Sequence, residues 1–196
     1  MLRLDPRHTA LVMIDLQNWI VGRPVAPHSG GDVIERSLRI GKALRKAGGT
    51  VILVRVAFSD GYGDVVKVPV DAPLILPEDK MPAEAVAFDE RINPSKADVV
   101  ITKRQWSAFH GTELDLQLRR RGIDTVIITG IATNFGVEAT ARDAFANNYA
   151  AIVVEDATSS MTAEMHRFSI DHVLPRVARI RSSAVIIDAL KEAMKD

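Results

Sequence analysis

Two opposite charges each follow directly on a short apolar run in this sequence. Asp15 comes immediately after the run at residues 10–14, and Lys103 comes immediately after the run at residues 99–102. A charged group at the end of a buried strand is costly unless it is paired or used in chemistry. The pattern therefore predicts either a satisfied ion pair or a proton-transfer site, and strand position alone leaves both interpretations open.

A third segment with chemical potential is the turn at residues 129–136, which reads Thr-Gly-Ile-Ala-Thr-Asn-Phe-Gly. It joins an apolar run to a helical pattern, with Thr133 or Asn134 expected as the helix N-cap. Free amides at a helix N-terminus can bind a carboxylate or a developing oxyanion. Gly136 falls in the first predicted turn, where glycine is unfavourable. It serves either close packing or the approach of a ligand.

A second group of residues lies close to these three points and could contact a ligand. Arg55 stands inside an apolar strand, where its charge needs a partner or a ligand carboxylate. The aromatic rings either pack in the core or line a pocket. The side-chain amides of Gln17 and Asn134 either orient a substrate or cap a loop or helix. The substrate-binding candidates are Gln17, Arg55, Trp106, Asn134, Phe135 and Gly136.

The elements that must position these residues alternate between strands and helices. Apolar runs occur at residues 10–14, 51–57, 99–102, 125–129 and 151–154, with a short sixth at 177–180; helical patterns occur at 32–47, 113–121, 135–147, 163–174 and 183–194. Continuous apolar strands are buried on both faces. The alternation predicts a three-layer α/β/α, Rossmann-like, doubly wound sheet of six parallel strands. Ligands of such sheets bind outside the carboxyl ends of the strands, where Asp15, Lys103 and the 129–136 turn fall.

The chain length of 196 residues suits a single domain spanning residues 1–196. Residues 59–94 interrupt the strand–helix rhythm and contain five prolines. A loop of this length in a compact domain is usually functional or flexible. We expect it to be either part of the function or an arm at an interface.

Composition narrows the function classes. Lys+Arg and Asp+Glu both number 25, which argues against a nucleic-acid binder. The apolar runs are too short for a membrane span or a signal peptide, so a cytoplasmic protein is expected. The sequence has no Gly-rich dinucleotide or triphosphate motif and no metal-binding pair of histidines. We therefore expect a small-molecule substrate, no cofactor and no metal.

Three motifs in this order resemble the isochorismatase-like, or cysteine hydrolase, superfamily. They are Val-Met-Ile-Asp15-Leu-Gln17, then Lys103-Arg-Gln-Trp-Ser-Ala-Phe109 followed by Gly111-Thr112, and then Gly130-Ile-Ala-Thr-Asn-Phe-Gly-Val-Glu-Ala-Thr-Ala-Arg-Asp143. The resemblance covers nearly the whole chain. It implies a six-stranded parallel sheet, frequent homo-oligomerisation as a dimer or tetramer, and catalytic roles for Asp15 and Lys103. It also implies a cis peptide bond between Ile131 and Ala132.

The chain departs from the superfamily's amidases at Gly136, which occupies the position of their nucleophilic cysteine. The sequence contains no cysteine at all, so a covalent thioester route is excluded. Isochorismatases of the superfamily also carry glycine there and hydrolyse a vinyl ether with the aspartate as general acid. The Ala-Thr-Asn segment before Phe135 is closer to the amidase branch. Nicotinamidases bind a metal through histidines after the second strand, and residues 51–94 contain none.

The resulting hypothesis is a hydrolase acting on a small carboxylate- or amide-bearing molecule. It would cleave a vinyl ether, C–N or ester bond by non-covalent general acid–base catalysis. Whether Asp15 acts as acid or base depends on burial, which raises its pKa, against Lys103, which lowers it. Two alternatives stay open: a catalytically degenerate member that only binds a small ligand, and an oligomeric structural or interaction protein.

Overall fold

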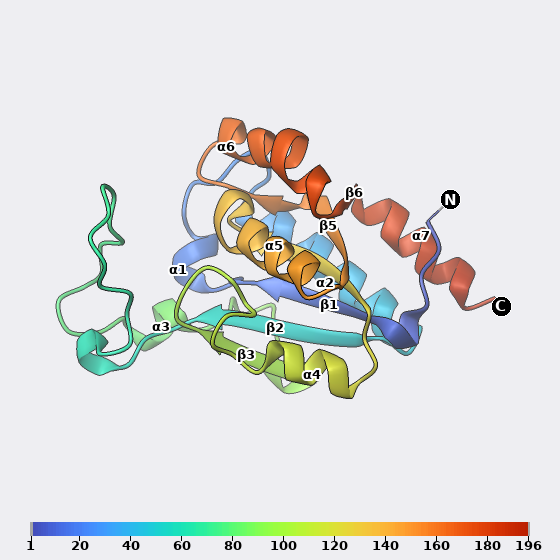
Figure 1. The fold of residues 1–196 in the computed structure, drawn as a ribbon, viewed down its shortest axis with the longest axis horizontal. Helices are drawn as coiled ribbons and strands as arrows, with labels where there is room; N and C mark the ends of the chain where they lie inside the picture. Colours follow the sequence, from blue (N-terminus) through green and yellow to red (C-terminus); the bar gives the residue numbers. More distant parts are fainter. Residues whose placement is uncertain (1, 196) are drawn as a thin grey trace.

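The computed structural model describes residues 2–195, and its centre is a twisted sheet of six parallel strands (Figure 1). The strands lie in the order β3-β2-β1-β4-β5-β6. Their bounds are β1 (Thr9–Ile14), β2 (Thr50–Val56), β3 (Val99–Lys103), β4 (Thr125–Ile131), β5 (Ala150–Ser159) and β6 (Arg179–Arg181). The predicted fold class is confirmed, and the continuous apolar runs explain why: every residue of β1 is buried.

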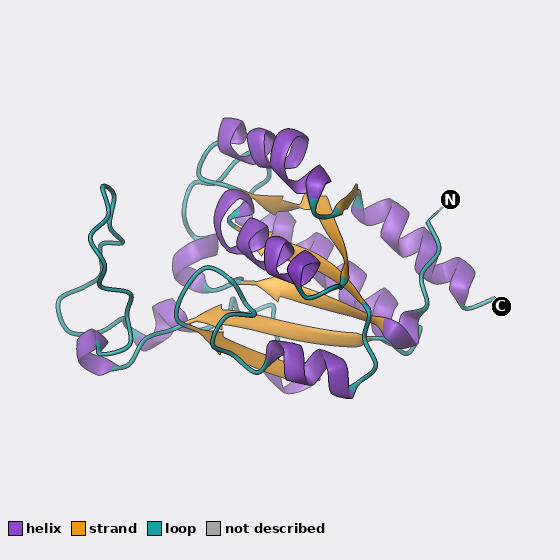
Figure 2. Ribbon diagram, viewed as in Figure 1, coloured by secondary structure: helices purple, strands orange, loops and turns teal. Residues whose placement is uncertain are grey.

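Helices cover both faces of this sheet (Figure 2). Their bounds are α1 (Asn18–Val21), α2 (Gly30–Lys46), α3 (Ala83–Val86), α4 (Leu114–Arg120), α5 (Glu138–Ala146), α6 (Ala163–Phe168) and α7 (Ser183–Ala193). One apolar core joins alternate strand residues to α4 and α5, and a second joins the other strand residues to α2 and α7. The two-residue alternation of side chains along each strand therefore fills two separate cores.

The strand order changes direction between β1 and β4, which are neighbours although they are distant in sequence. Ile14 pairs with Gly130 at the carboxyl ends of these two strands. In doubly wound sheets this switch point, outside the carboxyl ends of the strands, is where ligands bind. Asp15 leaves β1 there, and the predicted 129–136 turn leaves β4 there. The topology thus brings two of the three sequence motifs to one place.

Two local predictions differ from the structure. The helix expected from residue 135 begins with a π-helical turn, Thr133–Val137, before α5 starts at Glu138. The strand expected at residues 151–154 runs on to Ser159, with a register shift where it passes Gly130. Both differences lie beside the switch point between β1 and β4, where the backbone leaves regular geometry.

The long loop at residues 59–94 contains a short 3₁₀ turn at Asp60–Tyr62 and the four-residue helix α3. Between them the chain leaves the body of the protein as a projecting arm beyond the carboxyl ends of the strands (Figure 1). Within residues 2–195, no helix combines the length and apolar character needed to cross a membrane.

Candidate active site

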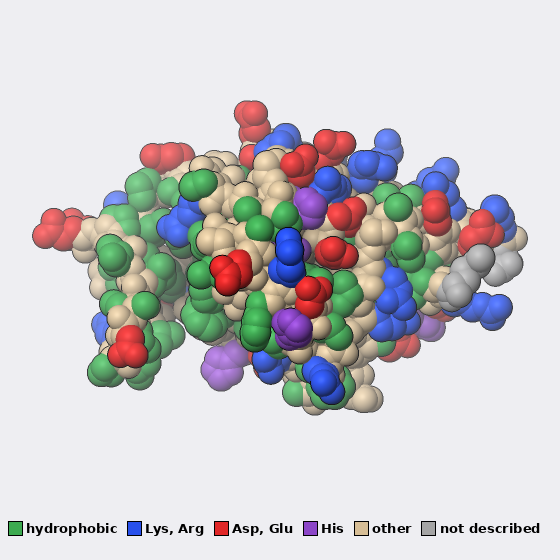
Figure 3. All heavy atoms as spheres, turned by 90° about the horizontal axis from the view of Figure 1, so that it is seen from above, with side chains coloured by type: hydrophobic (Ala, Val, Ile, Leu, Met, Phe, Trp, Pro, Cys, Tyr) green, Lys and Arg blue, Asp and Glu red, His purple; other side chains and the backbone are tan. Residues whose placement is uncertain are grey.

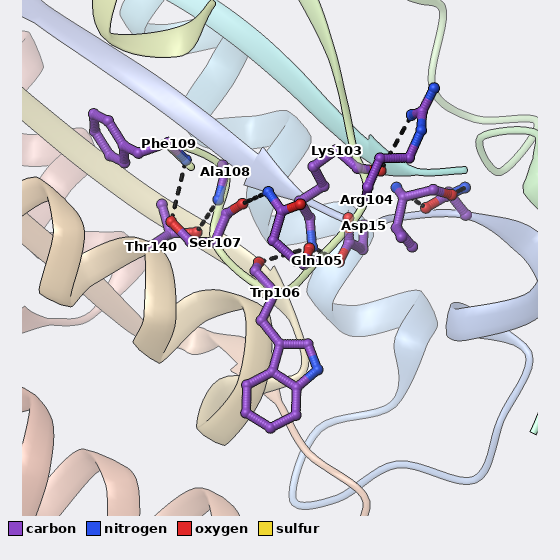
Figure 4. Close-up of polar contacts among 11 residues, drawn as sticks. Asp15, Lys103, Arg104, Gln105, Trp106, Ser107, Ala108, Phe109 and Thr140 are labelled. Atoms are coloured by element: carbon purple, nitrogen blue, oxygen red, sulfur yellow. Dashed lines mark hydrogen bonds and ion pairs between the residues drawn. The ribbon is translucent and has the colours of Figure 1, made fainter. Parts of the chain in front are cut away.

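Asp15 and Lys103 form a buried ion pair at the carboxyl ends of the strands (Figure 4). The Lys103 Nζ atom lies 2.7 Å from Asp15 Oδ2, and their side chains are 2% and 6% exposed. β2 separates the strands that carry the two residues, so the long lysine side chain spans the gap. The two charges that the sequence singled out therefore meet directly.

The Lys103 ammonium group has three donors, and each has an acceptor. Besides Asp15 Oδ2, Nζ donates to the backbone carbonyls of Gln105 at 3.1 Å and Trp106 at 2.8 Å. An ammonium group offers no fourth hydrogen. Lys103 therefore orients Asp15 and fixes the loop that follows β3. The two carbonyls were not identified from the sequence, because backbone acceptors carry no side-chain signal.

Burial controls the proton affinity of Asp15. Desolvation raises the pKa of this carboxyl group to about 6, although the Lys103 charge acts in the opposite direction. The second carboxylate oxygen, Oδ1, is buried and has no hydrogen-bond partner within the described residues. Asp15 thus combines a pKa near neutrality with one free acceptor atom, which are the properties of a proton-transfer group.

The backbone around Asp15 is held in an unusual conformation. Asp15 has a φ of +53°, a region that non-glycine residues visit rarely. Gly130 on β4 has a φ of +120°, and a Cβ atom there would lie 2.0 Å from the Ile14 carbonyl oxygen. Only glycine permits this close approach of β4 to the end of β1. This close approach lies directly before the strained residue Asp15.

Gly136 faces the ion pair. A Cβ atom built at this position would lie 3.3 Å from Asp15 Oδ2 and 3.5 Å from Lys103 Nζ. It would also approach Ile14 Cγ2 at 3.0 Å, a contact that needs a small adjustment. The peptide bond between Ile131 and Ala132 at the start of this turn is cis. The turn therefore presents its smallest residue to the two charges.

The predicted N-cap at Thr133 or Asn134 is wrong. The π-helical turn follows Ala132, and no side chain caps it. Asn134 instead accepts a short hydrogen bond from the Ser160 hydroxyl group through Oδ1. Thr133 Oγ1 lies 2.8 Å from Nδ1 of His166, a buried histidine of α6. These side chains tie the turn to β5 and α6, which sequence spacing did not indicate.

His166 remains neutral near physiological pH. Burial is the largest cause that lowers its pKa, to about 4, and the nearby His28 contributes in the same direction. The two rings meet edge to face with their centroids 6.0 Å apart. A neutral imidazole can hold the Thr133 hydroxyl group without adding a charge beside the turn.

Besides Asn134, two more of the substrate-binding candidates, Gln17 and Arg55, hydrogen-bond to protein groups. Gln17 is fully buried, and its amide nitrogen donates to the Val56 and Val86 carbonyls while its oxygen accepts from the Val56 amide. It therefore joins β2 to α3. The Arg55 Nε atom donates to Thr102 Oγ1 at 3.0 Å. Because Thr102 and Lys103 are consecutive strand residues, Arg55 lies on the opposite face of the sheet from Lys103.

The aromatic candidates lie at the rim of the site. Trp106 is 62% exposed, and its ring contacts Phe135 with centroids 5.0 Å apart. Figure 4 shows the indole ring directed away from the ion pair. Phe135 is half-buried and precedes Gly136. The Trp106 ring is therefore the exposed member of the pair, and the Trp106 carbonyl connects it to Lys103.

A second ion pair lies immediately beside the first and was not predicted. Arg104 turns outward from the residue after Lys103 and contacts Asp64 at 2.5 Å. Asp64 also accepts hydrogen bonds from the Ser59 amide and hydroxyl groups at 2.8 and 2.9 Å. These contacts attach the base of the projecting arm to the loop after β3. In the sequence, only the position of Arg104 directly after Lys103 pointed to a second charged contact here.

One further carboxylate near the strand ends has structural partners. Asp156, which follows the apolar part of β5, accepts from the Ser183 amide and hydroxyl groups and so fixes the start of α7. The part of the chain that the structure describes contains no cluster of three or more His, Cys, Asp or Glu side chains able to hold a metal ion.

Comparison with known proteins agrees with this architecture. The isochorismatase domain family model matches residues 9–185. The isochorismatase family protein YecD of Escherichia coli O157:H7 is 46% identical over 195 residues, covering 97% of this chain and all of YecD. The structure of an isochorismatase family protein from Burkholderia thailandensis superposes with a TM-score of 0.90 at 41% identity, covering 96% of this chain and 98% of the other.

The comparison also includes a relative with a named reaction. The ureidoacrylate amidohydrolase RutB of Methylobacterium radiotolerans is 33% identical over 197 residues, covering 87% of this chain and 74% of RutB. The family match spans most of the chain, the full-length relative YecD carries the same family name, and the fold agrees. This chain is a member of the isochorismatase family of hydrolases.

Proposed function

We propose that this protein hydrolyses a small amide-bearing molecule by general base catalysis, with water as the nucleophile and Asp15 as the base. The observation that carries the proposal is the geometry at Gly136. The Cβ position there lies within hydrogen-bonding distance of both Asp15 Oδ2 and Lys103 Nζ. Amidases of the family carry a cysteine at this position, and in this proposal the attacking water lies beyond the Gly136 Cα, on the side where their side chain would extend.

The reaction follows from these positions. The water oxygen attacks the substrate carbonyl carbon while Asp15 accepts one water proton, and the carbonyl electron pair moves onto its oxygen. The tetrahedral intermediate then collapses and the C–N bond breaks. Asp15 returns the proton to the leaving nitrogen. The products are a carboxylic acid and an amine, and no covalent enzyme intermediate forms.

The pKa of Asp15 favours the role of base over that of acid. With a pKa of about 6, Asp15 is mainly ionised at pH 7. A base is most effective when its pKa lies slightly below the working pH. The acid route of vinyl ether cleavage would need the minor, protonated form. The amidohydrolase name of RutB also supports an amide substrate.

Lys103 acts by orientation in this mechanism. Its three donors hold Asp15 and two loop carbonyls, so none is left for the substrate. Its charge keeps the pKa of Asp15 from rising further. Lys103 thereby keeps the base ionised and pointed at the space above Gly136.

The proposal is tested by adding one methyl group at Gly136. Wild-type protein and Gly136→Ala are assayed against a panel of small amides, esters and vinyl ethers. We expect amide turnover by the wild type and a loss of at least about tenfold in Gly136→Ala, because the methyl group displaces the attacking water. Gly31→Ala is the matched control, since its Cβ would make only ordinary contacts.

The outcomes separate the alternatives. Equal turnover in wild type and Gly136→Ala would contradict water attack at this position. Turnover confined to vinyl ethers would contradict the amide assignment. Binding of panel members without turnover would support the degenerate, ligand-binding alternative instead.

A further inference from the structure

The loop between β3 and α4, residues 104–113, forms part of the candidate site although it contains neither helix nor strand. Two of its backbone carbonyls, those of Gln105 and Trp106, accept hydrogen bonds from the Lys103 ammonium group. Backbone outside regular structure has to find its hydrogen-bond partners elsewhere. The position of the ammonium group therefore depends on the contacts that hold this loop in place.

Two side chains of α5 hold the loop. Asp143 Oδ2 accepts a hydrogen bond from the Ser107 hydroxyl group at 2.5 Å. About one helical turn earlier, Thr140 Oγ1 accepts a hydrogen bond from the Ala108 amide at 3.1 Å (Figure 4). Residues three positions apart lie on the same face of a helix. One face of α5 therefore contacts two consecutive residues of the loop.

Ser107 connects these two contacts to the carbonyls that bind Lys103. It directly follows Trp106 in the chain, and its own carbonyl accepts a hydrogen bond from Gln105 Nε2 at 3.2 Å. Its Oγ atom also accepts a hydrogen bond from the Phe109 amide at 3.1 Å. Ser107 is buried, so bulk water does not replace these partners. A displacement of Ser107 would therefore move both carbonyls.

The Asp143 carboxylate is used for this contact and not for an ion pair. Basic and acidic side chains are interspersed over the face of the protein drawn in Figure 3, where ion pairs are an ordinary feature. The neighbouring Arg142 pairs with Glu138 at 2.9 Å. Among the residues that the structure describes, no basic side chain pairs with Asp143, and its Oδ2 accepts from Ser107. Because a charged acceptor makes a stronger hydrogen bond than a neutral one, Asp143 is a firm anchor for the loop.

The helix that carries the two anchors also continues the turn that contains Gly136. The π-helical turn Thr133–Val137 leads directly into α5, which begins at Glu138. The inner face of α5 is buried at Thr140, Ala141 and Ala144, so the helix is fixed against the core. One element therefore sets the positions of Gly136 on one side of the site and of the Lys103-binding loop on the other.

We propose that Asp143 and Thr140 are positioning residues for Lys103. From α5 they fix the loop whose two carbonyls hold the ammonium group, and the ammonium group in turn orients Asp15. They act through the loop and are not themselves catalytic. The effect on turnover rests on the proposed function, whereas the effect on the ion pair does not.

Loss of an anchor would loosen the ion pair. A buried ammonium group needs its acceptors, and two of the three acceptors of Lys103 belong to the loop. When the loop moves, Nζ leaves its present distance of 2.7 Å from Asp15 Oδ2. The charge of Lys103 and its hydrogen bond are the causes that lower the pKa of Asp15 against the effect of burial. The pKa of Asp15 should therefore rise above about 6.

The first experiment compares two substitutions of Asp143 that remove the same charge. Asp143→Asn keeps an oxygen acceptor for the Ser107 hydroxyl group, and Asp143→Ala removes it. Infrared absorption of ¹³C-aspartate protein gives the pKa of Asp15, whose signal is assigned by its absence in Asp15→Asn. We expect this pKa to be at least about 0.5 higher in Asp143→Ala than in Asp143→Asn. Equal pKa values in the two folded variants would overturn the proposal.

A second pair of variants decides the question if Asp143→Ala does not fold. Thr140→Ser keeps the hydroxyl acceptor for the Ala108 amide, and Thr140→Val replaces it with a methyl group of similar shape. Thermal unfolding establishes that each variant is folded. The pKa of Asp15 should again be higher in the variant without the acceptor, and equal values would remove Thr140 from the proposal. Asp188→Ala is the control, since this helical aspartate is 71% exposed on α7, and it should leave the pKa of Asp15 unchanged.

Kinetics separates this inference from the proposed reaction. On an amide that the wild type hydrolyses, kcat should be at least about fivefold lower in Asp143→Ala than in Asp143→Asn, with KM values within about threefold of each other. A loss confined to KM would indicate a role in substrate binding and would contradict positioning. If no amide is hydrolysed, the proposed function fails, while the pKa comparison still decides whether Asp143 and Thr140 position Lys103.

Discussion

Two ion pairs stand side by side in this molecule, and they behave in opposite ways. Lys103 and Arg104 are consecutive residues, each paired with an aspartate. The Asp15–Lys103 pair is almost completely buried, whereas the side chains of Asp64 and Arg104 are 31% and 39% exposed. The pKa of Asp15 is raised to about 6. The pKa of Asp64 is lowered to about 2, first by the Ser59 amide and also by Arg104.

The difference shows that burial, and not the presence of a cation, decides which aspartate can exchange a proton near neutral pH. Both carboxylates have a partner within 2.7 Å. Asp64 keeps contact with water and accepts several hydrogen bonds, so its charged form is stable. Burial removes water from Asp15 and raises its pKa, and the opposing effect of Lys103 is smaller. The inner pair is therefore the candidate for proton transfer, whereas the outer pair attaches the base of the arm to the loop after β3.

The largest expected effect comes from removing the inner carboxylate. Asp15→Asn should lower turnover about 10²- to 10⁴-fold, the range for loss of a general base. Asp64→Asn, the matched change in the outer pair, should leave the chemical step within about threefold of wild type. Steady-state kinetics on an amide found in the panel measures both. Equal losses in the two variants would remove the functional distinction between the pairs.

Removing the inner cation should cost stability as well as activity. Lys103→Met leaves Asp15 buried without a counter-charge, and breaking such a pair costs about 3–5 kcal/mol in the free energy of unfolding. The pKa of Asp15 should also rise above 6, because the lysine is the cause that lowers it. Urea denaturation gives the first quantity, and the pH dependence of carboxylate infrared absorption in ¹³C-aspartate protein gives the second.

The pH dependence of turnover distinguishes base from acid in the inner pair. If Asp15 is the base, kcat/KM rises about tenfold per pH unit up to pH 6 and then levels, because only the ionised form is active. If Asp15 is the acid, kcat/KM is level below pH 6 and falls above it. An amide assay from pH 4.5 to 8 separates the two. A profile with no inflection near 6 would contradict either role.

The sequence predicted the fold well because strands buried on both faces must be apolar throughout, and that pattern is visible without a structure. It also predicted that Asp15 and Lys103 lie at the same edge. It could not predict how the residues around them are used. The φ of +53° at Asp15 follows a point where Gly130, from a strand more than a hundred residues away, approaches the Ile14 backbone closely.

The roles of the nearby polar side chains were unpredictable for a similar reason. Gln17 and Asn134 have the chemistry of ligand-binding residues, yet each hydrogen-bonds to protein groups distant in sequence. Sequence spacing describes neighbours along one helix or strand. It carries no information on which carbonyl or hydroxyl group of another element arrives at the same place. The contacts of Asp64 with Arg104 and of Thr133 with His166 were not predicted for the same reason, since each joins residues distant in sequence.

The smallest effect should come from the outer cation. Arg104→Met removes a partly exposed pair, and such pairs contribute about 0–1 kcal/mol to the free energy of unfolding. Because water and ions reach this pair, 1 M NaCl should abolish most of the difference between wild type and Arg104→Met. A double-mutant cycle with Asp64→Asn measures the coupling directly. The Lys103→Met loss should persist in the same salt, since ions do not screen a buried pair. A coupling above about 2 kcal/mol for the outer pair, unaffected by salt, would show that its contacts, too, are withdrawn from solvent.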